Sequence, residues 1–134
     1  MELISGVELF EAITNANKKR FDEKRAKAYM RELFLAVSHL HAQDIIHRDI
    51  KPQNIMVDKH DRLRLIDFGL AEVIEKSKKD VNIAGTPMYM SPEAYEGKIS
   101  KASDMWALGV LLYQIVSGYY PFNGTSREDL MDDI

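Results

Sequence analysis

The sequence contains no cysteine, and this absence excludes a disulfide framework and any zinc site built on cysteine. A cysteine-free chain fits the reducing cytosol, so we expect a cytoplasmic protein. The longest apolar run, residues 106–113, is far shorter than the ~20 residues that a membrane-spanning helix needs. No basic segment precedes an apolar one near the first residue, so we expect no secretory signal.

An excess of charge of one sign is also missing. The chain has 18 Lys and Arg against 21 Asp and Glu, a net charge of −3, so we expect no binding to nucleic acid or to a membrane. Hydrophobic residues make up 46% and charged residues 29%, which is typical of a globular protein and not of a disordered one. At 134 residues the chain is at most one domain, with room for a core but short for a two-lobed enzyme.

The sequence is organised around residues 45–70 (IIHRDIKPQNIMVDKHDRLRLIDFGL), a predicted strand–turn–strand. Asn54 and Asp67 carry oxygen donors of the type that Mg²⁺ takes together with substrate phosphates. Asp49 is a carboxylate that can orient a hydroxyl and take its proton. Lys51 shares a face of the extended segment with Asp49, which places positive charge where a transferred phosphoryl group builds up negative charge. The pattern predicts phosphoryl transfer.

Three motifs in a fixed order carry a resemblance. Residues 47–54 (HRDIKPQN), then 67–69 (DFG), then 91–93 (SPE) resemble the catalytic loop, magnesium loop and end of the activation segment of eukaryotic protein kinases. DFG alone would be weak, because any surface turn can carry it; the alternative interpretation is a hairpin with solvated charges. The fold class that the resemblance implies is mainly α with a small β hairpin element: a protein-kinase-like large lobe, truncated at both ends.

The resemblance covers residues 1–134 and implies a partial kinase domain. In chain order it implies the hinge, catalytic loop, magnesium loop, activation loop and a central buried helix, with the small lobe and the last helices absent. The first ten residues (MELISGVELF) are similar to the hinge of the calcium/calmodulin-dependent group, with Gly6 expected in a turn. We also expect a contiguous apolar patch on the surface that the missing parts would cover.

The resemblance assigns roles residue by residue. It implies Asp49 as the catalytic base, with Lys51 on the phosphoryl group and Thr86 beside them in the catalytic set. Lys51 and Thr86 favour the serine/threonine branch of the family. Asn54 and Asp67 are implied as the ligands of Mg²⁺.

The resemblance also implies an ATP site. Backbone groups of Glu2 and Ile4 would bind adenine, Met56 would form the floor beneath it, and Asp67 would reach the nucleotide through the metal. Glu8 would reach the ribose or a basic residue of the substrate. From the residues alone, Glu8 is equally well a carboxylate at a helix start, and Met56 is ordinary core.

The implied function is transfer of a phosphoryl group from Mg²⁺–ATP to Ser or Thr hydroxyls of a protein substrate. Regulation of the calcium/calmodulin type is a weaker expectation from the same resemblance. The alternative is a catalytically inactive kinase-fold fragment that acts as a binding module or is a truncated gene product. It arises because the glycine-rich phosphate loop and the strand lysine of the family are not found in this sequence, so we expect this chain alone to be a poor kinase.

Apolar periodicity predicts two long helices. Asp22 is predicted to cap an amphipathic helix that ends near His41. Ser103 is predicted to cap a second helix over residues 104–117, with Gly118 as its stop. Apolar residues lie all round the second helix, which predicts burial on every side.

Three histidines lie close to the catalytic stretch. His39 and His41 are predicted to be packing or surface residues, because neither has an acid at metal-site spacing on its helix. His47 follows two isoleucines and is predicted to be buried. By resemblance, Asp104 at the start of the second helix holds the backbone of the catalytic loop.

Overall fold

The computed structural model describes residues 5–67, 69, 71–73 and 85–134. Helices dominate it, with two small antiparallel sheets of strand order β1-β3-β4 and β2-β5, which confirms the predicted mainly α class. Within these residues, no helix is long and apolar enough to cross a bilayer. The elements are β1 (Gly6–Glu8), α1 (Leu9–Asn15), η1 (Asn17–Lys19), α2 (Glu23–Ala42), β2 (Ile45–Ile46), η2 (Pro52–Asn54), β3 (Ile55–Asp58), β4 (Leu63–Leu65), β5 (Glu72–Val73), η4 (Pro87–Tyr89), α3 (Pro92–Tyr95), α4 (Lys101–Ser117) and α5 (Arg127–Asp133).

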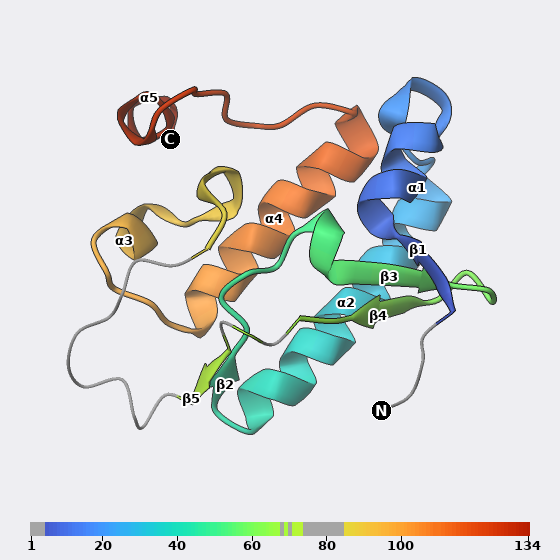
Figure 1. The fold of residues 1–134 in the computed structure, drawn as a ribbon, viewed down its shortest axis with the longest axis horizontal. Helices are drawn as coiled ribbons and strands as arrows, with labels where there is room; N and C mark the ends of the chain where they lie inside the picture. Colours follow the sequence, from blue (N-terminus) through green and yellow to red (C-terminus); the bar gives the residue numbers. More distant parts are fainter. Residues whose placement is uncertain (1–4, 68, 70, 74–84) are drawn as a thin grey trace.

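The two long helices α2 and α4 cross the middle of the molecule, and the other elements flank them (Figure 1). The three-stranded sheet and α1 lie on one side, whereas α3 and α5 lie on the other. The β3–β4 hairpin confirms the predicted strand–turn–strand, with Ile55 paired to Leu65 and Val57 to Leu63. The loop between β2 and η2 passes in front of α4 in this view before it leads into β3 (Figure 1).

Helix α2 begins and ends close to where the sequence predicts. Asp22 is its N-cap, and the Asp22 side chain accepts a hydrogen bond from the Arg25 N–H at 2.7 Å. The helix ends at Ala42, one residue beyond His41. Its buried positions recur with the spacing of one helix face: Ala26, Tyr29, Met30, Leu33 and Val37.

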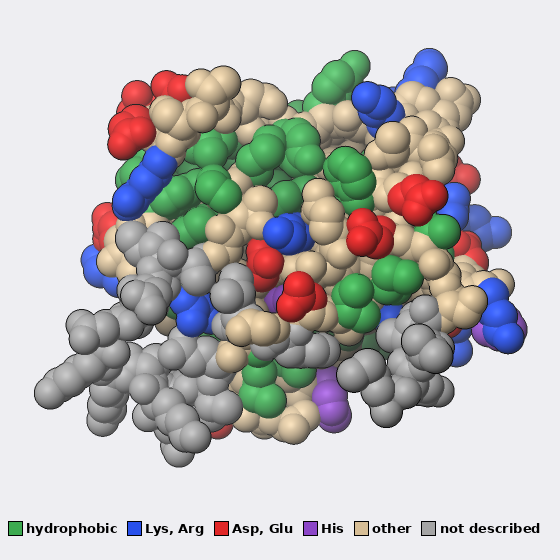
Figure 2. Space-filling model, in the orientation of Figure 1, with side chains coloured by type: hydrophobic (Ala, Val, Ile, Leu, Met, Phe, Trp, Pro, Cys, Tyr) green, Lys and Arg blue, Asp and Glu red, His purple; other side chains and the backbone are tan. Residues whose placement is uncertain are grey.

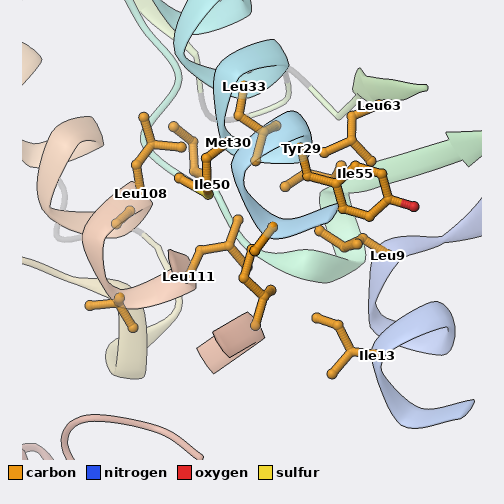
Figure 3. Close-up of a cluster of buried hydrophobic side chains, with 14 of the residues drawn as sticks. Leu9, Ile13, Tyr29, Met30, Leu33, Ile50, Ile55, Leu63, Leu108 and Leu111 are labelled. Atoms are coloured by element: carbon orange, nitrogen blue, oxygen red, sulfur yellow. The ribbon is translucent and has the colours of Figure 1, made fainter. Parts of the chain in front are cut away.

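The main hydrophobic core lies where α1, α2, α4 and the three-stranded sheet meet. A fully buried Leu, Ile, Met or aromatic side chain contributes about 1.5–3 kcal/mol to the free energy of folding. The core therefore fixes β3, and the loop before it, against both long helices. Figure 3 shows Leu9 and Ile13 of α1, Tyr29, Met30 and Leu33 of α2, Ile50 of the loop before η2, Ile55 of β3, Leu63 of β4, and Leu108 and Leu111 of α4.

The predicted start of α4 is wrong by one turn. The helix begins at Lys101, and Ser100 is the N-cap, whose hydroxyl accepts from the Ala102 N–H at 3.2 Å. Ser103 lies inside the first turn, where its hydroxyl accepts from the Ser100 N–H at 3.1 Å and closes a capping box. Gly118 ends the helix at φ 84°, the left-handed conformation that glycine adopts most easily, as predicted.

The prediction that α4 is buried on every side is also wrong. One face packs on α2 and the core, but Met105, Leu112, Tyr113 and Val116 are 38–48% exposed. None of the described elements covers this second face fully. Apolar periodicity reports which faces can be buried, and it cannot report whether a neighbour is present.

Gly6 lies in strand β1, not in the predicted turn. It pairs with Asp58 of β3, and a Cβ atom at Gly6 would lie 2.1 Å from the carbonyl oxygen of Val57. The absence of a side chain therefore lets the backbone of β1 approach β3 closely.

Candidate active site

Asp49 and Lys51 lie in the extended loop between β2 and η2, on either side of Ile50. Ile50 is only 1% exposed, and alternate side chains of an extended segment point to opposite sides. Burial of Ile50 therefore turns Asp49 and Lys51 together toward the surface. Lys51 Nζ lies 3.5 Å from Asp49 Oδ2, so the predicted shared face is confirmed.

The hydroxyl of Thr86 joins this pair from the segment before η4. It donates to Asp49 Oδ1 at 3.0 Å and accepts from Lys51 Nζ at 2.7 Å. A hydroxyl between a carboxylate and an ammonium is in the position from which a base can take its proton. Figure 2 shows charged side chains of both signs near the middle of this face, over the segment that leads into β3.

Asn54, at the end of η2, holds the carboxylate in place. Its Nδ2 donates to the backbone oxygen of Asp49 at 2.8 Å and to Asp49 Oδ2 at 3.0 Å. Asn54 is 5% exposed. Because both bonds use the amide nitrogen, the amide oxygen is left as an acceptor or a metal ligand.

Asp67 follows β4 and is exposed, with a backbone φ of 56°. Asp tolerates this left-handed region better than most residues. Its Oδ1 accepts from the Gly69 N–H at 3.2 Å. The preceding residue, Ile66, donates its N–H to the backbone oxygen of Asn54 at 2.8 Å, which brings the start of the DFG segment beside η2.

His47 is fully buried, as predicted, and connects the same two segments. Its Nδ1 accepts from the Asp49 N–H at 3.2 Å, so Nε2 carries the proton that goes to the backbone oxygen of Ile66 at 3.1 Å. The imidazole thus links the catalytic loop to the DFG segment. By the resemblance to protein kinases, His47 would pack in one apolar column with Phe68, and Phe68 lies outside the described residues.

Asp104, in the first turn of α4, anchors the loop between β2 and η2 by accepting hydrogen bonds from its backbone. Its side chain is 1% exposed. Oδ2 accepts from the His47 N–H at 2.9 Å and Oδ1 from the Arg48 N–H at 3.0 Å, as the resemblance implies. Arg48 has a φ of 74°, a strained conformation for a residue with a side chain. The two bonds from Asp104 therefore hold a strained turn immediately before Asp49.

His41 is partly buried, in line with the prediction of a packing or surface residue, but the prediction missed its polar contact with Asp104. His41 Nε2 lies 2.8 Å from Asp104 Oδ2, and the His41 side chain is 14% exposed. No short-range pattern could have found this contact, because 63 positions separate the two residues. His39 agrees with the prediction: it is exposed, and among the described residues its side chain bonds only to Gln43.

The segment that carries Thr86 is itself fixed to α4. The Tyr89 hydroxyl lies 2.6 Å from Gln114 Oε1, and both side chains are buried. Burial, aided by the neighbouring Tyr120 hydroxyl, raises the pKa of Tyr89 well above its ordinary value, so Tyr89 remains a neutral donor. The Tyr95 hydroxyl donates to the Pro87 backbone oxygen at 2.5 Å. Nothing in the sequence indicated the role of Gln114, because a single glutamine on a helix cannot be distinguished from an exposed polar residue by its spacing.

The predicted nucleotide contacts are only partly described. Glu2 and Ile4 lie outside the described residues. Glu8 and Met56 are paired across β1 and β3, so the structure brings these two together. Glu8 is exposed and occupies the N-cap position of α1, so its carboxylate lies at a helix start, as the alternative interpretation predicts, although its side chain makes no capping hydrogen bond. The Met56 side chain is half-buried.

The donor set fits Mg²⁺ bound together with a phosphate ligand. Asn54 offers an amide oxygen and Asp67 an exposed carboxylate, and Mg²⁺ typically takes one or two such groups plus substrate phosphates. Within the ranges that the structure describes, no group of three or more His, Cys, Asp or Glu could form an all-protein metal cage. The fit therefore depends on a phosphate-bearing ligand.

Residues 1–134 match the family model described as the protein kinase domain, so the chain belongs to the protein kinase family. Death-associated protein kinase dapk-1 of Caenorhabditis elegans is 41% identical over 138 residues. Serine/threonine-protein kinase PEPKR2 of Arabidopsis thaliana is 37% identical over 134 residues, and calcium-dependent protein kinase 5 of Plasmodium berghei is 36% identical over 137. Each alignment covers 100% of this chain, but the chain spans only 10%, 28% and 24% of these relatives, respectively.

Proposed function

We propose that this chain is the catalytic part of a serine/threonine protein kinase that transfers a phosphoryl group from Mg²⁺–ATP to protein hydroxyls. The observation that carries the proposal is the Asp49–Thr86–Lys51 arrangement, in which a hydroxyl already lies between a carboxylate and an ammonium. Membership of the kinase family and the name of the plant relative support the same activity and branch.

In the proposed reaction, Asp49 orients the attacking hydroxyl of the substrate and accepts its proton. Asn54 and Asp104 keep the carboxylate and its backbone from rotating. Lys51 places positive charge beside the phosphoryl group as its negative charge develops. Asn54 and Asp67 would hold Mg²⁺, which supplies charge stabilisation to the phosphates when bound.

Two carboxylate variants test the assigned roles. Asp49→Asn should slow transfer by ~10²–10⁴-fold, because the base is lost, and should leave nucleotide affinity nearly unchanged. Asp67→Asn should weaken Mg²⁺-dependent nucleotide binding. Asp132→Asn, which changes an exposed acid far along the chain, is the matched control. Calorimetric titration with Mg²⁺–ATP and radiolabel transfer should be measured on this chain and on any longer polypeptide that contains it; equal loss of affinity in both variants contradicts the roles.

The hydroxyl specificity has its own test. Lys51 and Thr86 support transfer to Ser or Thr and not to Tyr. Phosphoamino-acid analysis of a labelled protein substrate should therefore show phosphoserine and phosphothreonine. Mainly phosphotyrosine would contradict the branch assignment.

Regulation and location complete the proposal. The name of the Plasmodium relative supports calcium-linked control, so transfer should change when Ca²⁺, with or without calmodulin, is added to the polypeptide that contains this chain. A chain without cysteine suits the cytoplasm, so we propose a cytoplasmic location. Fractionation of cells that express the protein checks this location.

A non-catalytic binding module is the second candidate. An open, mainly apolar groove of about 720 Å³ lies between α2 and α4, and exposed apolar side chains line it, among them Phe34, Leu35, Leu112 and Val116. A contiguous apolar patch of this kind is typical of a surface that packs against another element. If the chain neither binds Mg²⁺–ATP nor transfers phosphate in any longer polypeptide, this candidate replaces the first.

A further inference from the structure

Two contacts join α5 to the short helix α3, which lies on the same side of α4 (Figure 1). The guanidinium of Arg127, at the start of α5, donates a hydrogen bond to the backbone oxygen of Tyr95, at the end of α3. The same guanidinium lies over the Tyr95 ring, with its carbon atom 5.3 Å from the ring centroid. This distance is within the range of a cation–π interaction. Arg127 therefore holds both the backbone and the ring of Tyr95.

The position of Arg127 is unfavourable for α5 itself. Arg127 is the first residue of the helix, where a positive charge opposes the helix dipole. The two acids that follow it in the first turn, Glu128 and Asp129, have the favourable sign there. The stability of α5 alone thus gives no reason for an arginine at this position, whereas the contacts with Tyr95 do.

Tyr95 in turn holds the segment that carries Thr86. Tyr95 is 2% exposed, and its hydroxyl donates to the backbone oxygen of Pro87 at 2.5 Å. Burial raises the pKa of Tyr95, against a smaller opposing effect of the Arg127 charge, so the hydroxyl stays protonated and can donate. The same Pro87 oxygen accepts from the Met90 N–H at 3.2 Å. The Tyr95 hydroxyl therefore fixes the turn that directly follows Thr86.

We infer that Arg127 is a positioning residue for phosphoryl transfer, acting through Tyr95 on the turn that carries Thr86. This inference rests on the proposed function, in which the Thr86 hydroxyl lies between Asp49 and Lys51. Without the guanidinium, the Tyr95 ring loses a contact on one face and its backbone oxygen loses a donor, so its hydroxyl no longer holds the turn in one place. A displacement of about 1 Å is enough to slow a reaction that depends on such geometry.

Amide hydrogen exchange tests the inference without requiring activity. The Tyr89 N–H bonds to the Thr86 oxygen at 3.0 Å, and the Met90 N–H bonds to the Pro87 oxygen at 3.2 Å. These two amides therefore report opening of the turn, and the amide of Leu111 in the core reports global unfolding. The quantity to measure is the ratio of exchange at the two turn amides to exchange at Leu111.

In Arg127→Met this exchange ratio should rise about tenfold, because a charge-assisted bond is lost. Arg31→Met, which makes the same change at an exposed position of α2, is the matched control and should keep the ratio within about twofold. Arg127→Lys keeps a positive charge near the Tyr95 ring and should recover part of the protection. An unchanged ratio in Arg127→Met, or the same rise in Arg31→Met, overturns the inference.

Tyr95→Phe distinguishes this route from a general loosening of α5. It removes the bond to Pro87 and keeps an aromatic ring beneath Arg127, so the ratio should rise at least as much as in Arg127→Met. Because Arg127 acts through the Tyr95 hydroxyl, adding Arg127→Met to Tyr95→Phe should raise the ratio by less than about twofold more. Effects of the two substitutions that simply multiply would contradict the route.

Kinetics give an independent measurement. If the proposed function holds, Arg127→Met should lower kcat/KM for a protein substrate about tenfold and leave KM for ATP nearly unchanged. A change in KM for ATP alone contradicts positioning of the turn that carries Thr86. If neither the wild type nor any variant transfers phosphate, in this chain or in a longer polypeptide that contains it, the proposed function fails, and the exchange ratios still decide the role of Arg127.

Discussion

The two carboxylates of the proposed site are held in different ways. Asp49 is bonded to Asn54 and Thr86, and its backbone is anchored through Asp104 to α4. Asp67 is exposed, and among the described residues its side chain bonds only to the Gly69 N–H, two positions along the chain. The first is fixed by distant segments of the fold, and the second by its own turn.

This difference follows from the chemistry that each carboxylate is proposed to perform. A base must be oriented before the hydroxyl arrives, and preorganisation by buried bonds costs nothing at the moment of reaction. A metal ligand is ordered by the ion itself, since the ion and its phosphates supply the strongest charges in the site. We therefore expect variants near Asp49 to change stability and variants at Asp67 to change mainly ligand binding.

The largest effect on stability should come from Asp104→Ala, which removes the anchor of the loop that carries Asp49. The substitution leaves the His47 and Arg48 amides and the His41 imidazole without their acceptor in a buried site. We expect the free energy of unfolding to fall by about 3–5 kcal/mol. Urea denaturation followed by circular dichroism measures this, with Asp132→Ala as an exposed control that should change it by less than ~0.5 kcal/mol. A loss of the same size in both variants would contradict the anchoring role.

A smaller effect is expected for the segment that carries Thr86. Gln114→Leu removes the buried acceptor of the Tyr89 hydroxyl and should cost about 1–3 kcal/mol. Tyr89→Phe in the same background should recover part of the loss, because the unpaired hydroxyl is removed as well. Denaturation of the single and double variants measures the coupling; strictly additive losses would show that the bond does not stabilise the segment.

Substitutions at Asp67, which is held by its own turn, should change the free energy of unfolding only slightly. Asp67→Ala loses the bond to Gly69 and places a less tolerant residue at φ 56°, so it should cost about 1 kcal/mol. Asp67→Gly suits the same backbone and should stay within ~0.5 kcal/mol. If Asp67→Ala is as damaging as Asp104→Ala, this turn is not locally determined.

The smallest effect is a pH dependence at the β3–β4 turn, a second locally held site. Asp58 Oδ1 accepts from the Arg62 and His60 N–H groups, and these bonds, that from Arg62 first, lower the pKa of Asp58. Because the folded pKa lies below the unfolded one, this stabilisation is fully present above the unfolded value and is lost as the pH falls through the folded pKa. Between about pH 5 and pH 3, the urea midpoint of Asp58→Asn should therefore fall less steeply than that of the wild type.

The spacing of residues in the sequence predicted the loop before η2 and the β3–β4 hairpin well, because the contacts that determine both join residues only a few positions apart. Alternation around Ile50 fixed the shared face of Asp49 and Lys51, and residues 63–65 alternated as a strand should. The contact of His41 with Asp104 joins positions too distant for any periodicity to relate. The start of α4 was misplaced because Ser100 and Ser103 are both good capping residues, and only the structure shows that they cap each other.

The anchoring of the loop by Asp104 also has a kinetic consequence. The bonds from His47 and Arg48 to Asp104 close loops of 57 and 56 residues, whereas the β3–β4 hairpin joins residues only a few positions apart. Long closures carry a larger entropic cost and form late, so α2 and the hairpin should assemble before α4 docks. A chain that has folded that far would contain its core strands and still lack an ordered Asp49. The ordered arrangement around Asp49 should therefore appear in refolding only with the final docking of α4, after most of the far-UV signal has returned.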